Sequence, residues 1–164
     1  MPSTPPWPTL MVLLATLISL HLLLTVAGLL FGRLASNFRT RGRLALAIVL
    51  MASGAYHLHH YRGFAEKMPL EGAAGRTMAA WVAGGQLLGG ALLAVPGAAW
   101  PATLVVTAVA GILLAGSLCW ATFLWMSADG PTGLAAALPV LRRAAVCAIV
   151  AAWAGWFGLR RPDP

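Results

Sequence analysis

The feature that most restricts the fold of this chain is a set of long apolar stretches with almost no charge. The first, residues 9–31, has no charged side chain and one histidine. A helix of about 20 mainly apolar residues crosses the hydrocarbon core of a bilayer and satisfies its own backbone hydrogen bonds there. No lysine or arginine precedes the stretch, so it lacks the positive region of a signal peptide. It therefore predicts a retained transmembrane helix.

The composition of the whole chain also indicates a protein surrounded by lipid. Apolar residues make up 60% of the 164 residues and charged residues only 9%, whereas soluble domains carry about 25% charged residues. A soluble domain of this size could not bury so much apolar surface. The four acidic residues also fit poorly with a hydrolase or a proton-coupled transporter. We expect one domain over 1–164, embedded in the lipid bilayer.

Four further stretches follow, and together they predict an all-α integral membrane bundle of five transmembrane helices. Three of them are 44–60, 77–95 and 102–125. The last, 134–159, is interrupted by Arg142 and Arg143. For it we favour a short interfacial helix that either turns or continues into a span from residue 144.

The distribution of basic residues predicts the orientation. The net charge is +7, and the basic residues that produce it lie at the ends of the apolar stretches. This placement suits contact with phospholipid headgroups and argues against nucleic acid as a partner. The segment 32–43 has four arginines and no acid. Short loops rich in arginine stay in the cytoplasm. We therefore expect a multi-pass protein of the bacterial inner (cytoplasmic) membrane, with the N-terminus outside, 57–76 external and the C-terminus cytoplasmic.

The densest polar cluster contains His57, His59 and His60, flanked by two tyrosines. Imidazole binds haem iron, copper or zinc, but on a helix only His57 and His60 share a face. The favoured interpretation is an interfacial belt that contacts headgroups or a partner, with no cofactor. A haem or metal site is the alternative.

His21 stands alone near the middle of the first predicted span. Polar residues in hydrocarbon usually face the bundle interior and are often functional. A neutral imidazole bonded to a neighbouring helix explains the residue equally well. A haem bridged between His21 and His57 is not expected, because neighbouring antiparallel helices place them at different depths.

The third predicted span carries Gly85 and Gly89, the small-xxx-small pattern that allows helix backbones to approach closely. Gln86 can donate or accept a hydrogen bond across such a contact. We expect these three residues to serve helix packing inside the bundle, with contact to a partner as the alternative.

Residues 43–159 resemble the DoxX-like membrane proteins, small four-helix proteins named after a subunit of an archaeal terminal oxidase. The likeness lies in Gly54-Ala55-Tyr56-His57 followed by Phe64 and Met68-Pro69, and in the glycine-rich run 83–90 that leads to Pro96. At the position where the family often has an acidic residue, this chain has Gln86. The predicted span 9–31 is an additional helix before the four-helix unit.

The resemblance implies a four-helix unit associated with membrane redox systems, often as an accessory subunit. The leading hypothesis is a non-catalytic subunit or assembly partner of a bacterial membrane complex, with electron transfer as the first class to test. The alternative is a small quinone- or haem-linked oxidoreductase that uses His57, His59 or His60. A transporter is disfavoured because no charged residue lies deep in a predicted span and proline-broken span interiors are absent.

Overall fold

The structure, a computed structural model, describes residues 7–31, 38–66, 72–127 and 131–158, with the side chains of the first helix described over 12–26. These residues contain helices and no strand, which confirms the all-α class. The elements are α1 (Trp7–Phe31), α2 (Phe38–His59), α3 (Tyr61–Ala65), α4 (Gly72–Ala94), a 3-10 turn η1 (Pro96–Ala98), α5 (Ala99–Ser127) and α6 (Pro131–Gly158).

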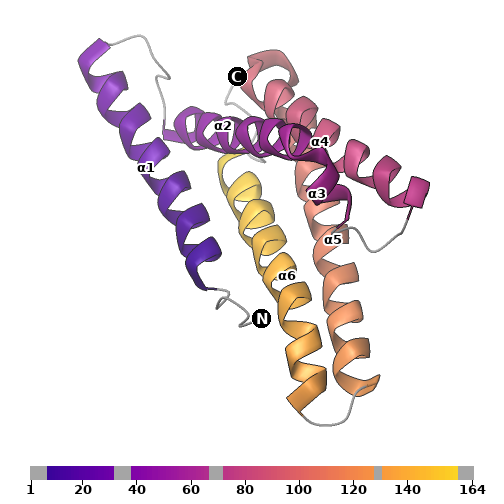
Figure 1. The fold of residues 1–164 in the computed structure, drawn as a ribbon. Coiled ribbons are helices and arrows are strands. Elements are labelled where there is room, and N and C mark those ends of the chain that lie inside the picture. Colours follow the sequence, from indigo (N-terminus) through magenta and orange to yellow (C-terminus); the bar gives the residue numbers. More distant parts are fainter. Residues whose placement is uncertain (1–6, 32–37, 67–71, 128–130, 159–164) are drawn as a thin grey trace.

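The helices are arranged mainly as two pairs. α5 and α6 run side by side as a long hairpin, and α2 packs along α4 to form the second pair, which crosses one end of the hairpin (Figure 1). α1 stands to one side and contacts α2 and α6. The core lies where these elements meet and contains buried residues from α1, α2, α4, α5 and α6: Leu17, Leu46, Ala47, Leu93, Ala102 and Ala154.

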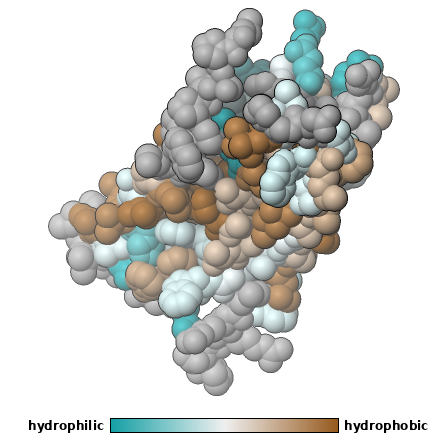
Figure 2. Space-filling model, turned by 90° about the horizontal axis from the view of Figure 1, so that it is seen from below, coloured by the Kyte–Doolittle hydropathy of each residue, from teal (hydrophilic) through white to brown (hydrophobic). Residues whose placement is uncertain are grey.

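Three helices in the described part are long and apolar enough to cross a membrane: Gly72–Ala94, Pro96–Ser127 and Thr132–Gly158. The described part of α1 includes a shorter apolar segment, Val12–Val26. Large apolar side chains are exposed along these helices, Ile112 at 71% and Trp156 at 74% among them. Patches of hydrophobic residues lie among paler and hydrophilic ones on the face seen in Figure 2. The chain is therefore a multi-pass membrane protein whose outer surface contacts lipid.

The last stretch forms one helix, so of the two alternatives left open for it, a turn or a continuation into the span, the structure has the continuation. α6 runs from Pro131 to Gly158 with Pro139 inside it. Its buried positions continue along a single face on both sides of the arginine pair: Gly133, Ala137, Ala144, Cys147 and Ala154. Because this face packs against α5, the helix persists through a proline that removes one backbone hydrogen bond. Arg143 lies on the exposed side of α6.

The second helix also differs from its expected limits. It begins at Phe38 rather than at residue 44, so the arginine-rich segment forms its first turns. The contacts of Gly42 explain why α2 begins before residue 44. Gly42 is buried, and the Phe157 ring lies directly against it. Its carbonyl oxygen accepts a hydrogen bond from Trp153 Nε1 at 2.8 Å. Packing on α6 therefore holds the arginines in a helix.

Candidate functional site

The main polar junction inside the bundle joins α2 to α4 through Gln86. Its Oε1 atom lies 2.9 Å from His57 Nδ1 and 3.3 Å from Ser53 Oγ. Ser53 and His57 are one turn apart on α2, so one side-chain amide on α4 binds both. The cross-helix hydrogen bonds expected of Gln86 are present.

The acceptor at this junction identifies the ring nitrogen of His57 that donates. A carbonyl oxygen only accepts hydrogen bonds, so His57 donates to Gln86 through Nδ1–H. The ring stacks on Phe64 of α3 with centroids 3.9 Å apart and planes 4° from parallel. Tyr61 donates to the backbone oxygen of Arg76 at 2.6 Å and ties α3 to the first turns of α4. His57 is thus held in place by contacts from two neighbouring helices, α3 and α4.

The close approach that lets Gln86 reach α2 depends on two glycines, one on each helix. A Cβ atom on Gly54 would lie 2.8 Å from the Ala83 oxygen, and one on Gly90 would lie 2.7 Å from the Ala47 oxygen. Both contacts are with backbone atoms, which have no rotamer to change. Sequence reasoning missed Gly54 and Gly90 as packing residues, although Gly90 continues the face of α4 that contains Ala79 and Ala83.

Gly85 and Gly89 lie elsewhere on α4. Gly85 is exposed, with no atom within 4 Å of a Cβ placed there, and a Cβ on Gly89 would lie 3.4 Å from Val106 Cγ2 of α5. The expectation that Gly85 packs inside the bundle is therefore wrong, because it faces away from α2. The alternative, contact with a partner, stays a prediction. Gly89 faces α5, where such a Cβ atom would make an ordinary van der Waals contact.

The other two histidines of the cluster lie at the exposed end of α2. His60 follows the last residue of α2, its Nδ1 lies 3.2 Å from the Tyr56 oxygen, and its ring lies 4.3 Å from the Tyr56 ring. His59 is exposed and contacts the His60 ring. Over 7–31, 38–66, 72–127 and 131–158, no three side chains of histidine, cysteine or acidic residues are grouped as metal ligands.

His21 faces the bundle interior, as one interpretation of the sequence expected. It is 9% exposed and surrounded by the rings of Phe38, Trp153 and Phe157, with centroids 4.7, 6.3 and 5.4 Å away. Its neighbour Phe38 lies at the opposite end of α2 from His57. At 1.5 Å per residue these ends are about 28 Å apart, so the structure does not bring His21 and His57 together.

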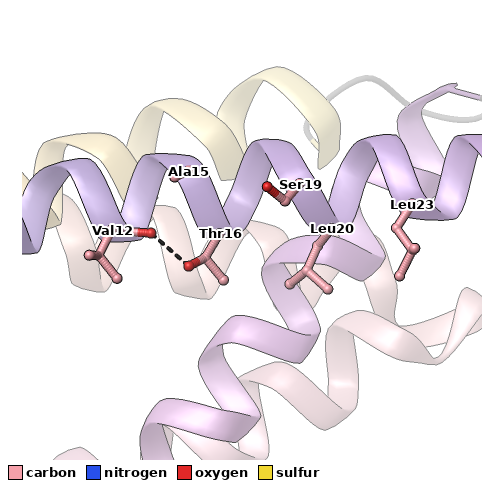
Figure 3. Close-up of a pocket in the computed structure, with 6 residues that line it drawn as sticks. All are labelled: Val12, Ala15, Thr16, Ser19, Leu20 and Leu23. Atoms are coloured by element: carbon pink, nitrogen blue, oxygen red, sulfur yellow. Dashed lines mark hydrogen bonds between the residues drawn. The ribbon is translucent and has the colours of Figure 1, made fainter.

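The described surface has shallow grooves. One, of about 470 Å³, is lined by six residues that all belong to α1 (Figure 3): Val12, Ala15, Thr16, Ser19, Leu20 and Leu23. It contains no titratable side chain, and the Thr16 hydroxyl donates to the Val12 oxygen of the same helix at 2.6 Å. A second groove is lined by 59–63. A groove formed by one helix is a surface for contact rather than an enclosed reaction site.

Comparisons with protein-family models, curated proteins and solved structures gave no match for this chain.

Replacing Gln86 with methionine should destabilise the bundle by about 1 kcal/mol, the scale of one or two hydrogen bonds between membrane helices. The change leaves Ser53 Oγ and His57 Nδ1 without their acceptor. Thermal unfolding in mild detergent measures the effect. In a double-mutant cycle, His57→Ala should cost less in the Gln86→Met background than in the wild type. Additive costs would show that the His57–Gln86 bond contributes nothing.

Proposed function

We propose that this chain is a non-catalytic subunit or assembly partner of a bacterial membrane complex, with electron transfer as the first class of complex to test. It acts through helix faces and short loops. The observation that carries the proposal is the pair of opposite faces on α4, of which one is used inside the bundle and the other is free.

The inner face of α4 carries the contacts described above, through Ala83, Gln86 and Gly90, and includes the buried Ala79. The outer face holds Trp81, Gly84, Gly85 and Leu88, with Trp81 exposed at 78% and Leu88 at 62%. A Cβ atom on either glycine would meet open space. Two adjacent glycines bordered by large apolar side chains suit the close approach of another helix in lipid.

The resemblance of 43–159 to DoxX-like proteins supports the same class, since that family supplies accessory subunits to membrane redox systems. Gln86 stands at the acidic position of the family and is used here for hydrogen bonds to α2. This use supports a packing role and weakens a proton or cation role for the position.

For the arrangement in the membrane we propose five spans, α1, α2, α4, α5 and α6. The 22 residues of α2 reach about 33 Å, close to the thickness of a bilayer core of about 30 Å. The arginines of 32–43 are then cytoplasmic, the N-terminus is outside and the C-terminus is cytoplasmic.

Single cysteines at Ser36 and Ala73, in a background without Cys119 and Cys147, test this topology. An impermeant thiol reagent applied to intact cells should label the cysteine at residue 73 and leave that at residue 36 unlabelled. Permeabilised cells, in which both should react, are the control. Equal labelling in intact cells would show that α2 does not span, and labelling of residue 36 alone would reverse the orientation.

A small quinone- or haem-linked oxidoreductase is the alternative, and the fixed position of the His57 ring between Gln86 and Phe64 is the observation that favours it. An optical spectrum and metal content of the purified protein separate the two functions. We expect neither haem nor copper in stoichiometric amount. A Soret band that disappears in a His57→Ala/His60→Ala variant would establish the oxidoreductase in place of the subunit.

A further inference from the structure

Two arginines lie inside α6, far from both of its ends. The helix runs without a break from Pro131 to Gly158 and has 28 residues, whereas the hydrocarbon core of a bilayer takes about 20 residues of a helix. Any run of that length within α6 includes both Arg142 and Arg143. When α6 crosses the membrane, the pair therefore lies in the hydrocarbon at every placement of the helix. Charged residues at such positions are costly, usually paired, and often functional.

The helices of this chain contain no negative charge for Arg143. Its side chain is exposed, and its guanidinium makes no hydrogen bond or ion pair with the part of the chain that the structure describes. The five long helices α1, α2, α4, α5 and α6 contain no aspartate or glutamate. The spans of a second copy of this chain lack a carboxylate for the same reason. The counter-charge of Arg143 therefore has to come from a different molecule.

The loop end of the α5–α6 hairpin shows how deep Arg143 lies. This end stands clear of α2 and α4 (Figure 1), and exposed apolar side chains continue along it, Leu134 and Leu138 on α6 and Phe123 and Met126 on α5 among them. Such side chains are stable in lipid rather than in water. Leu134 lies about 14 Å along the helix from Arg143, at 1.5 Å per residue. A lipid phosphate beyond Leu134 is too far for one arginine side chain to reach by snorkelling.

The side of α6 that carries Arg143 suits contact with a second helix. Thr132, Ala136 and Pro139 precede Arg143 at spacings of three or four residues, so the four residues share one side of α6, and all of them are exposed. Small side chains allow helix backbones to approach closely in lipid. The Cα–Cβ bonds of a helix tilt toward its N-terminus, so the Arg143 side chain leans toward Pro139. A helix packed along this side would meet the guanidinium.

We propose that Arg143 forms an ion pair with an aspartate or glutamate in a transmembrane helix of a partner protein, and that this helix packs along the side of α6 that contains Ala136 and Pro139. The inference rests on the subunit role proposed above and adds the chemistry of one partner. A guanidinium and a carboxylate form two parallel hydrogen bonds, so each neutralises the charge of the other without water. The contact lies on α6 and is separate from the outer face of α4.

Affinity purification of the full-length tagged protein in mild detergent tests the ion pair. Arg143→Leu should reduce the amount of partner recovered about tenfold or more, because charge-assisted hydrogen bonds are lost. Arg143→Lys, which keeps the charge, should recover more partner than Arg143→Leu. Arg76→Leu makes the same change at an exposed arginine near the start of α4 and should recover the wild-type amount. Since Arg143 is exposed, Arg143→Leu in isolation should be as stable to heat as the wild type.

Exchange of the two charges then identifies the acid. The recovered partner should contain an aspartate or glutamate within an apolar helix, and its change to arginine should restore the recovery of Arg143→Glu. Undiminished recovery with Arg143→Leu, or a partner without an acid in its spans, overturns the ion pair and leaves the subunit role intact. Loss of bound phospholipid, measured as phosphorus, with unchanged partner recovery would assign Arg143 to lipid instead. If the wild type recovers no partner in any mild detergent, the subunit role itself fails, and the ion pair fails with it.

Discussion

Gly90→Ala should destabilise the helix bundle by about 1–3 kcal/mol or more, the cost of overpacking a close contact. The added Cβ atom would lie 2.7 Å from the Ala47 oxygen and 3.0 Å from the Met51 nitrogen of α2. Neither backbone atom can change rotamer, so α2 and α4 must separate. We expect the loss of the His57–Gln86 hydrogen bond as well, since it spans the same pair of helices. Thermal unfolding of the purified variant in mild detergent measures the effect.

Gly84→Ala is the matched control, because it makes the same change on the same helix where a Cβ atom meets open space. It should unfold at the wild-type temperature or above it, because alanine favours a helix more than glycine does. Gly54→Ala, whose Cβ atom would lie 2.8 Å from the Ala83 oxygen, should resemble Gly90→Ala. If Gly84→Ala and Gly90→Ala proved equally stable, the α2–α4 contact described above would be incorrect.

Gly85→Leu should abolish recovery of partner chains while the isolated protein stays as stable as the wild type. Its side chain would project from the outer face of α4 between Trp81 and Leu88 and prevent another helix from approaching the backbone. Affinity purification of the tagged variant in mild detergent, with identification of the chains recovered, measures the effect. The thermal unfolding of the same preparation shows whether the bundle is intact.

Leu88→Ala provides the complementary variant for this face. It removes an exposed side chain without blocking the backbone, so it should weaken partner recovery less than Gly85→Leu does. If Gly85→Leu recovered its partner chains in full, the outer face of α4 would not be part of the interface. If the isolated Gly85→Leu protein were less stable than the wild type, the side chain at residue 85 would not project into open space as described.

Much of the helical framework could be predicted from hydropathy, because lipid imposes helices on apolar stretches. The stretch 77–95 corresponds to α4 (Gly72–Ala94), and 102–125 corresponds to α5 (Ala99–Ser127). The start of α2 and the continuity of α6, which the sequence left open, have a common explanation. Charged residues within a stretch were taken as interruptions, yet tertiary contacts hold the helix through Arg142 and Arg143 in α6 and through the arginines at the start of α2.

The side-chain contacts were predictable only in part. Gln86 is the polar residue of an apolar span, so a hydrogen bond across helices could be expected, but its partners Ser53 and His57 depend on the register of α2 against α4. The same register decides which glycines pack. Positions 85, 89 and 90 all have the residue type for close contact, and only the rotation of α4 places Gly90 against Ala47 and Gly85 outside. One sequence does not determine that rotation.

The composition of the wild-type preparation tests the central proposal most directly. The tagged protein is purified in several mild detergents, separated on native gels, and the co-purifying chains are identified. A subunit should migrate with other membrane proteins at a constant ratio, and the isolated chain should turn over no substrate. A wild-type protein that migrates alone in every detergent and catalyses a redox reaction by itself would contradict the account.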